Sequence, residues 1–285
     1  MTIELYNVSL PGRGVVSRLQ ANAFYGDSVP HALLVARDFS GPDGIIATMP
    51  ELINSSINSR FDSKIWDGFH TSNTEEIAGV SGAGNNVVIV LHGGGFINTP
   101  SKIDVRTAQP GDYSSMPGLQ GVGAELTDID QIKSQAGFGE IRDLLKGKLP
   151  DGRDIEVYSF SDYRRGIANL PRGHAIVLDA SQISQSRSED QFLDTLLEDP
   201  LFISRVGGQR KAEAFLHRVR QRYNTETYPN IHNFDETDFS KPHVYFLTFN
   251  PDAMDGIMAT YIWGNANFLA VDGDTIRQKL KDAAK

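Results

Sequence analysis

The sequence contains no cysteine among its 285 residues. This absence excludes disulfide bonds, thiolate nucleophiles and metal sites that use cysteine ligands. Basic side chains are in the minority, because 27 lysines and arginines face 36 aspartates and glutamates, for a formal net charge of -9. Since a positive surface is needed to displace counterions from phosphates, we expect no broad nucleic-acid binding.

Long apolar runs are also missing. No segment approaches the roughly 20 apolar residues that span a bilayer. The N-terminal residues include Glu4 but no basic segment or long apolar core, which argues against a secretory signal. We therefore expect a soluble, cytoplasmic protein without membrane contact. With 40% hydrophobic residues and no low-complexity linker, a single domain over residues 1–285 is the simplest division, and a subdivision near residue 150 is the alternative.

The most informative pattern lies between residues 85 and 100. The run from Val87 to Leu91 is apolar, rich in β-branched residues and bounded by polar ones, which predicts a buried strand. Three consecutive glycines follow at 93–95, a pattern typical of a tight turn or of main chain that approaches a ligand closely. Thr99-Pro100 then suits a helix start, where free N–H groups attract anions. An anion site is the leading interpretation, and a tight turn beside a buried, hydrogen-bonded His92 is the alternative.

Strand-like and helical patterns alternate after this loop. Two short apolar runs, Ile155–Tyr158 and Ala175–Leu178, are separated by enough residues for a crossover helix, which favours a parallel pair. Three strand-like segments near the C-terminus are joined by short turns, which favours antiparallel pairing. The sequence therefore predicts an α/β fold with a mixed, partly parallel sheet, flanked by helices and with an antiparallel C-terminal portion. In the first 80 residues we expect a strand over Ala32–Ala36 and a short helix over Glu51–Ile57.

The segment from Val87 to Phe96, with its His-Gly-Gly-Gly sequence, resembles the strand and oxyanion loop of the α/β-hydrolases related to hormone-sensitive lipase. The resemblance implies that backbone N–H groups of the loop stabilise a developing oxyanion. That family also carries a Gly-x-Ser-x-Gly elbow downstream, and no such motif is present here. The nearest substitute is Asp179-Ala180-Ser181, so an esterase-like enzyme would use His92, Ser181 and Asp179 as catalytic residues.

The same segment resembles the second glycine loop of the amino-acid kinase family, where a strand enters His-Gly-Gly-Gly and a helix follows. That family begins with a Lys-x-Gly-Gly strand whose lysine contacts phosphate, and the first 60 residues contain no such motif. This resemblance therefore transfers no catalytic residue.

Taken together, these patterns favour a small-molecule enzyme that binds an anionic or phosphorylated metabolite at the glycine loop, with His92 in hydrogen bonding or proton transfer. The expected ligand-binding residues are Gly93, Gly94, Gly95, Thr99, Arg164 and Arg165. An esterase-like hydrolase and a non-catalytic binding or assembly protein are the alternatives. We expect a small anionic partner and no metal, while the sequence specifies no cofactor, oligomeric state or reaction.

Overall fold

The protein is described here by a computed structural model, which covers residues 5–9, 18–26, 29–95, 137–149, 151–183, 191–232, 239, 243–251, 256–260 and 266–283. The strands are β1 (Leu5–Ser9), β2 (Arg18–Gly26), β3 (Ile45–Ile46), β4 (His70–Val80), β5 (Asn86–His92), β6 (Glu156–Ser159), β7 (His174–Asp179), β8 (Gln191–Phe192), β9 (Thr227–Tyr228), β10 (Asn230–Ile231), β11 (His243–Phe249), β12 (Ile257–Thr260) and β13 (Ala266–Val271). The helices are α1 (Val29–Ser40), α2 (Met49–Asn58), α6 (Gly137–Leu145), α7 (Phe160–Arg165), α8 (Leu193–Leu196), α9 (Pro200–Val206), α10 (Gln209–Tyr223) and α11 (Gly273–Ala283), with 3-10 turns η1 (Lys64–Trp66) and η3 (Ala180–Gln182).

An 11-stranded sheet organises the described part of the chain. One path runs β1-β2-β13-β4-β11-β12-β10, and a branch leaves β4 through β5 and β7 to β6. Most neighbours are antiparallel, including β5 with both β4 and β7. The parallel pairs are β6 with β7, β10 with β12, and a single register position between β13 and β4. A mixed sheet with helices is therefore confirmed, while the expected single domain stays a prediction.

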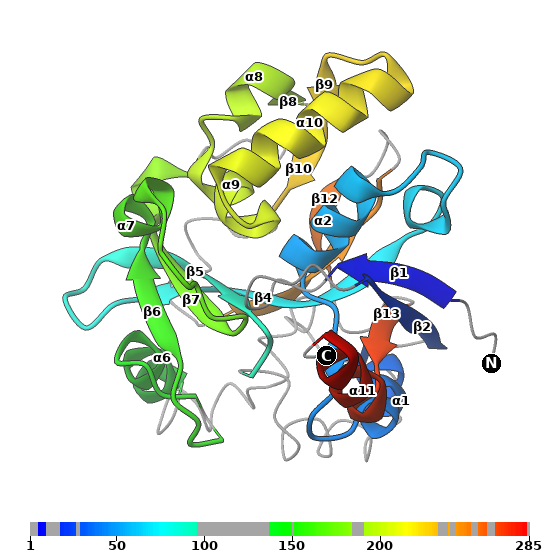
Figure 1. Cartoon of the computed structure of the whole chain (residues 1–285). Helices are drawn as coiled ribbons and strands as arrows, with labels where there is room; N and C mark the ends of the chain where they lie inside the picture. The colour runs from blue at the N-terminus through cyan, green and yellow to red at the C-terminus, as the bar shows by residue number, and fades with distance from the viewer. Residues whose placement is uncertain are drawn as a thin grey trace, which may run out of the picture.

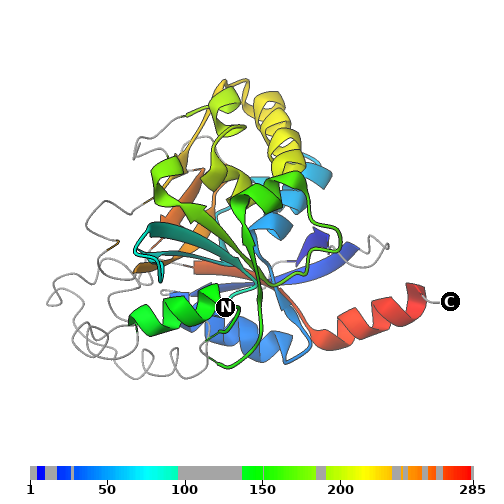
Figure 2. The ribbon, with the colours of Figure 1, turned by 90° about the vertical axis from the view of Figure 1, so that its left-hand side faces the viewer.

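Helices cover both faces of this sheet. Figures 1 and 2 show α2, α9 and α10 on one face and α1 and α6 on the other. Side chains of β5 alternate between the two apolar clusters: Val88 and Val90 pack with the first group of helices, whereas Val87, Ile89 and Leu91 pack with the second. Because both faces are covered, the run from Val87 to Leu91 in β5 is apolar without interruption. This uninterrupted run is why the sequence pattern predicted the strand.

The central strand β4 is polar and nevertheless buried along almost its entire length. Its side chains find partners inside the fold. The Ser72 hydroxyl donates to the Leu247 carbonyl at 2.7 Å, and Glu76 pairs with Arg205 through two contacts of 2.7 and 2.8 Å. Buried polar groups are tolerated when they are hydrogen-bonded. The sequence pattern did not predict this strand, because polar residues lack the apolar alternation that marks most strands.

One expectation about local structure is corrected. The segment Ala32–Ala36 lies within helix α1 and is not a strand. Its buried residues Val29, Ala32, Leu33 and Ala36 follow helical spacing, so the apolar run reflects a helix face. By contrast, the expected β-α-β unit is present as β6, α7 and β7, with a parallel register. Among the described residues, no helix combines the length and the apolar character that crossing a membrane requires.

Candidate functional site

His92 ends strand β5 and is completely buried. Its Nε2 lies 3.0 Å from the Ser204 carbonyl, which can only accept, so Nε2 carries the proton. Nδ1 must then accept from the Thr74 hydroxyl at 3.1 Å, while the same hydroxyl oxygen accepts the Met49 N–H at 2.9 Å. Burial is the main cause that holds the pKa of His92 well below its ordinary value. Electrostatic repulsion between the protonated forms of His92 and His174 is the second cause. His92 is therefore a neutral ring with both nitrogens occupied inside the fold.

The three glycines after His92 all adopt positive φ angles of 89°, 65° and 140°. Such angles are readily adopted only by glycine. The Gly93 N–H donates to the Asn73 carbonyl at 3.0 Å, and the Gly95 N–H donates to a Glu75 carboxylate oxygen at 3.2 Å. Two of the three amides in the expected anion loop thus already have acceptors, one of them a carboxylate. Thr99 lies outside the described residues.

Asp179 and Ser181 lie at the other end of strand β7 from His92. Asp179 pairs with Val87, whereas His92 pairs with His174. Five residues at about 3.4 Å each separate these positions by roughly 17 Å. Asp179 caps η3 by accepting from the Ser181 N–H at 2.9 Å and hydroxyl at 2.7 Å, and these hydrogen bonds lower the pKa of its carboxyl. The structure does not bring the three proposed catalytic residues together.

Strand β5 also differs from the setting in which glycine loops bind ligands in α/β enzymes. Ligands of open parallel sheets bind beyond the carboxyl ends of the strands, where neighbouring strands end together. Because β5 is antiparallel to both β4 and β7, its carboxyl end lies beside the start of β7. The strand order at the end of Val87–Leu91 therefore differs from that of open parallel sheets, and the glycine loop as a binding site stays a prediction.

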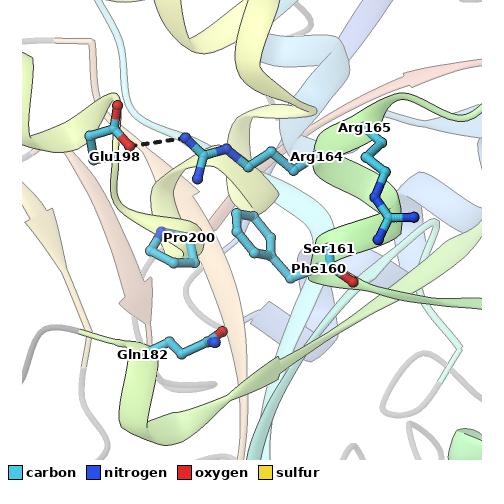
Figure 3. A pocket seen from close by; sticks show the side chains of 7 residues that line it. All are labelled: Phe160, Ser161, Arg164, Arg165, Gln182, Glu198 and Pro200. Atoms are coloured by element: carbon cyan, nitrogen blue, oxygen red, sulfur yellow. Dashed lines mark hydrogen bonds and ion pairs between the residues drawn. The ribbon is translucent and has the colours of Figure 1, made fainter.

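Arg164 and Arg165 belong to α7 and border a solvent-open hollow of about 690 Å³, which we call the α7–α9 hollow. Arg164 reaches Glu198 at 2.9 Å across the hollow, while Arg165 extends away from Glu198 and pairs with Asp162 at 3.3 Å (Figure 3). Both arginines are thus engaged with carboxylates. The hollow is lined by Phe160, Ser161, Arg164, Arg165, Gln182, Glu198 and Pro200.

The composition of the α7–α9 hollow suits contact with a polypeptide. Phe160 and Pro200 provide an apolar floor, and Ser161 and Gln182 add hydrogen-bonding groups around it (Figure 3). An apolar anchor surrounded by polar groups is the usual anatomy of a protein contact surface. Sequence reasoning found the two arginines and missed the floor, although Asp199-Pro200 carries the signal of a helix start that places this turn at the surface.

The wall of the hollow is fixed by a buried polar network behind it. Asp199 caps α9 by accepting the Leu201 N–H at 2.8 Å and also accepts from the Asn230 amide at 2.9 Å. Burial raises the pKa of the Asp199 carboxyl. Arg205 donates to Asn230 at 2.6 Å and is fully buried with its partner Glu76. This network ties α9 to strands β4 and β10, so the hollow is built on a firmly held element.

In the residues for which a structure is described, no group of three or more histidine, aspartate or glutamate side chains is placed to hold a metal ion.

No family model matches the sequence, and no curated protein matches it. Among solved structures, the fold is similar to that of a protein whose structure is described as "Accommodation of massive sequence variation in Nanoarchaeota by the C-type lectin fold". The TM-score is 0.60 with 21% sequence identity, and the match covers 90% of this chain and 99% of that chain. At this identity the likeness shows the fold alone, which is that of the C-type lectins.

This fold corrects the functional expectation from the sequence. A small-molecule enzyme built on a strand, glycine loop and helix is contradicted, because the similar structure has a C-type lectin fold.

Proposed function

We propose that this protein is a binding protein, in which a helix-covered sheet carries a contact surface for a segment of a partner protein. The observation that carries the proposal is the C-type lectin fold, shared over 90% of the chain. The similar structure is described as accommodating massive sequence variation. A fold that keeps its sheet while its sequence varies is suited to presenting different contact surfaces, because loops on a rigid scaffold can change without loss of the core.

The positions and hydrogen-bond partners of the chemically reactive side chains support this function. His92 is buried with both ring nitrogens engaged, and Ser181 lies at the other end of β7. A general base must come within hydrogen-bond reach of the proton that it takes. The small anionic ligand and the glycine loop as its site stay predictions, since nothing in the fold tests them.

We assign the contact surface to the α7–α9 hollow. A partner would place an apolar side chain against Phe160 and Pro200 and exchange hydrogen bonds with the rim. Arg164 is half exposed, and its ion pair with Glu198 stays in contact with water. Such a pair contributes little to folding stability, so its atoms remain available to a partner at low cost.

The proposal is tested by selecting peptides from a displayed random library on the immobilised protein and measuring their affinities in solution. Selected peptides should bind Ser161→Arg, whose long side chain fills the hollow, at least tenfold more weakly. Arg164→Ala should weaken binding several-fold. Arg277→Ala is the matched control, because Arg277 is 49% exposed against 47% for Arg164 and is also ion-paired.

Unchanged affinity in Ser161→Arg would move the contact surface elsewhere and overturn the site. Failure to enrich any peptide, together with catalytic turnover in a broad hydrolase and transferase panel, would overturn the binding function itself.

A further inference from the structure

Three buried polar atoms without hydrogen-bond partners among the described residues lie where α7, β7 and α9 meet. They are the Tyr163 hydroxyl, Nε2 of His174 and the Ser204 hydroxyl. A buried polar group that stays unsatisfied costs roughly 1–3 kcal/mol. Such groups are usually satisfied by an ordered water, an ion or a ligand. Three of them in one region indicate a small binding site.

Ring contacts place Tyr163, His174 and His92 next to one another. The rings of Tyr163 and His174 stack with centroids 5.9 Å apart, and the rings of His174 and His92 are 4.8 Å apart. His92 in turn bonds to the backbone of Ser204. The Tyr163 hydroxyl lies 3.8 Å from the position that a Cβ atom on Gly208 would occupy, and no other atom lies within 4 Å of that position. The site thus borders the turn between α9 and α10.

Helix α10 points its N-terminus at this site. Gly208 is its N-cap and supplies no side-chain cap. The Gly208 amide donates to the Ile203 carbonyl and the Lys211 amide to the Gly208 carbonyl, so the Gln209 and Arg210 amides are the ones without an acceptor within the helix. The helix dipole adds a partial positive charge at this end. Tyr163 is only 6% exposed, so its hydroxyl is a buried donor facing the same end. These groups are of the kind that bind an anion.

Lys211 adds a full positive charge in the first turn of α10, where the dipole is unfavourable for a cation. Its Nζ is 3.5 Å from the Pro50 carbonyl, and burial lowers the pKa of its ammonium group. The nearby carboxylate of Glu51 attracts it, but Arg172 already binds both Glu51 oxygens at 2.7 and 2.9 Å. Arg172 and Lys211 thus share the carboxylate of Glu51.

We propose that a small monoanion of the size of formate binds between the N-terminus of α10, Lys211 and the Tyr163 hydroxyl. The anion would accept from the Gln209 and Arg210 amides, the Lys211 ammonium group and the Tyr163 phenol. This site uses no residue of the α7–α9 hollow rim and is independent of the proposed partner surface.

His174 provides a second readout of the bound anion. Its Nδ1 donates to the Pro171 carbonyl at 2.8 Å, so the neutral ring presents a lone pair on Nε2. An adjacent anion favours the protonated ring. The charged and titratable groups that face His174 are His92 on β5, Tyr158 and Glu156 on β6, Tyr163 on α7, Lys211 on α10 and Arg172 in the preceding turn.

The test is thermal unfolding of the full chain titrated with sodium formate, with the ionic strength held constant by the salt of a bulky sulfonate. Formate should raise the unfolding temperature along a saturating curve. Lys211→Met should abolish this response, and Tyr163→Phe should weaken formate binding about tenfold. Lys148→Met, at an exposed ion-paired lysine, is the control and should respond as the parent protein does.

The histidine NMR signals give the independent measurement, because saturating formate should raise the pKa of His174. A linear response to formate, an equal response to the bulky sulfonate, or saturation in Lys211→Met would overturn the site. If Lys211→Met does not fold, Tyr163→Phe decides, since it removes one hydroxyl and keeps the ring. An unchanged formate affinity in that variant would overturn the site.

Discussion

His92 and His174 face each other across the antiparallel pair of β5 and β7, with ring centroids 4.8 Å apart. Each ring donates a proton to a backbone carbonyl, His92 to Ser204 and His174 to Pro171. Two rings this close cannot both be protonated without strong repulsion, and burial acts in the same direction. The pair is therefore neutral and connects the end of β5 and the start of β7 to α9.

This pair predicts that folding stability falls as the pH is lowered. Burial lowers the pKa of His174 from 6.5 to about 4, so between these values the unfolded chain binds a proton that the folded chain does not. Stability is then present above pH 6.5 and is lost as the pH falls towards about 4, by roughly 3 kcal/mol for this group. Urea denaturation at several pH values measures the slope. His174→Gln should flatten it, and His217→Gln, at an exposed site, should leave it unchanged.

The first glycine of the triple-glycine turn is expected to be required for stability. A Cβ atom at Gly93 would lie 3.0 Å from the Gly173 backbone, and φ at this position is 89°. Gly93→Ala should destabilise the protein by about 2–4 kcal/mol, from strain and overpacking together. Gly82→Ala is the control, because no atom lies near its Cβ position. Equal stabilities of the two variants in chemical denaturation would show that this turn tolerates side chains.

The buried pair of Glu76 and Arg205 should be far more sensitive to mutation than a surface pair. Glu76→Gln leaves the Arg205 guanidinium without its carboxylate in a fully buried site, so a loss of about 3–5 kcal/mol is expected. Asp62→Asn breaks the exposed pair with Arg60 and should cost no more than about 1 kcal/mol. Equilibrium unfolding of both variants measures the difference. A loss below about 1 kcal/mol for Glu76→Gln would mean that the buried charge is compensated elsewhere.

Ser181 should not behave as an activated nucleophile. Its hydroxyl donates to Asp179, and His92 pairs with a residue at the opposite end of β7. The carboxyl of Asp179 has a lowered pKa and is therefore a weak base, and without a stronger base a serine hydroxyl is a weak nucleophile. We therefore expect no covalent labelling of the folded protein by a fluorophosphonate, as read by intact mass. Stoichiometric labelling that disappears in Ser181→Ala would show that a base reaches it after all.

The sequence predicted the elements whose signal is local. The apolar run of β5 was visible because both faces of the strand are covered, and the short helix expected over Glu51–Ile57 lies within α2. The β-α-β unit was also predicted, since its strands are short, apolar and separated by a helix-length segment. These features follow from the periods of helices and strands alone.

The polar strand β4 and the role of the glycine turn depended on contacts between distant parts of the chain. Glu76 is separated by 129 positions from Arg205, and no sequence period connects them. Likewise, His-Gly-Gly-Gly is compatible with an oxyanion loop or with a buried turn. The partners that His92 and Gly95 have in the fold come from β4 and α9, which the sequence does not place beside the loop.

By itself the sequence determined the absence of cysteine chemistry, the acidic charge, the buried β5 strand and the glycine turn. Only the tertiary structure decided that β5 is antiparallel to its neighbours, that His92 lies far from Ser181, and that the fold is that of a C-type lectin. The physical reason is that hydrophobic periodicity records which face of an element is buried. It carries no record of which element covers that face or in which direction the neighbouring strand runs.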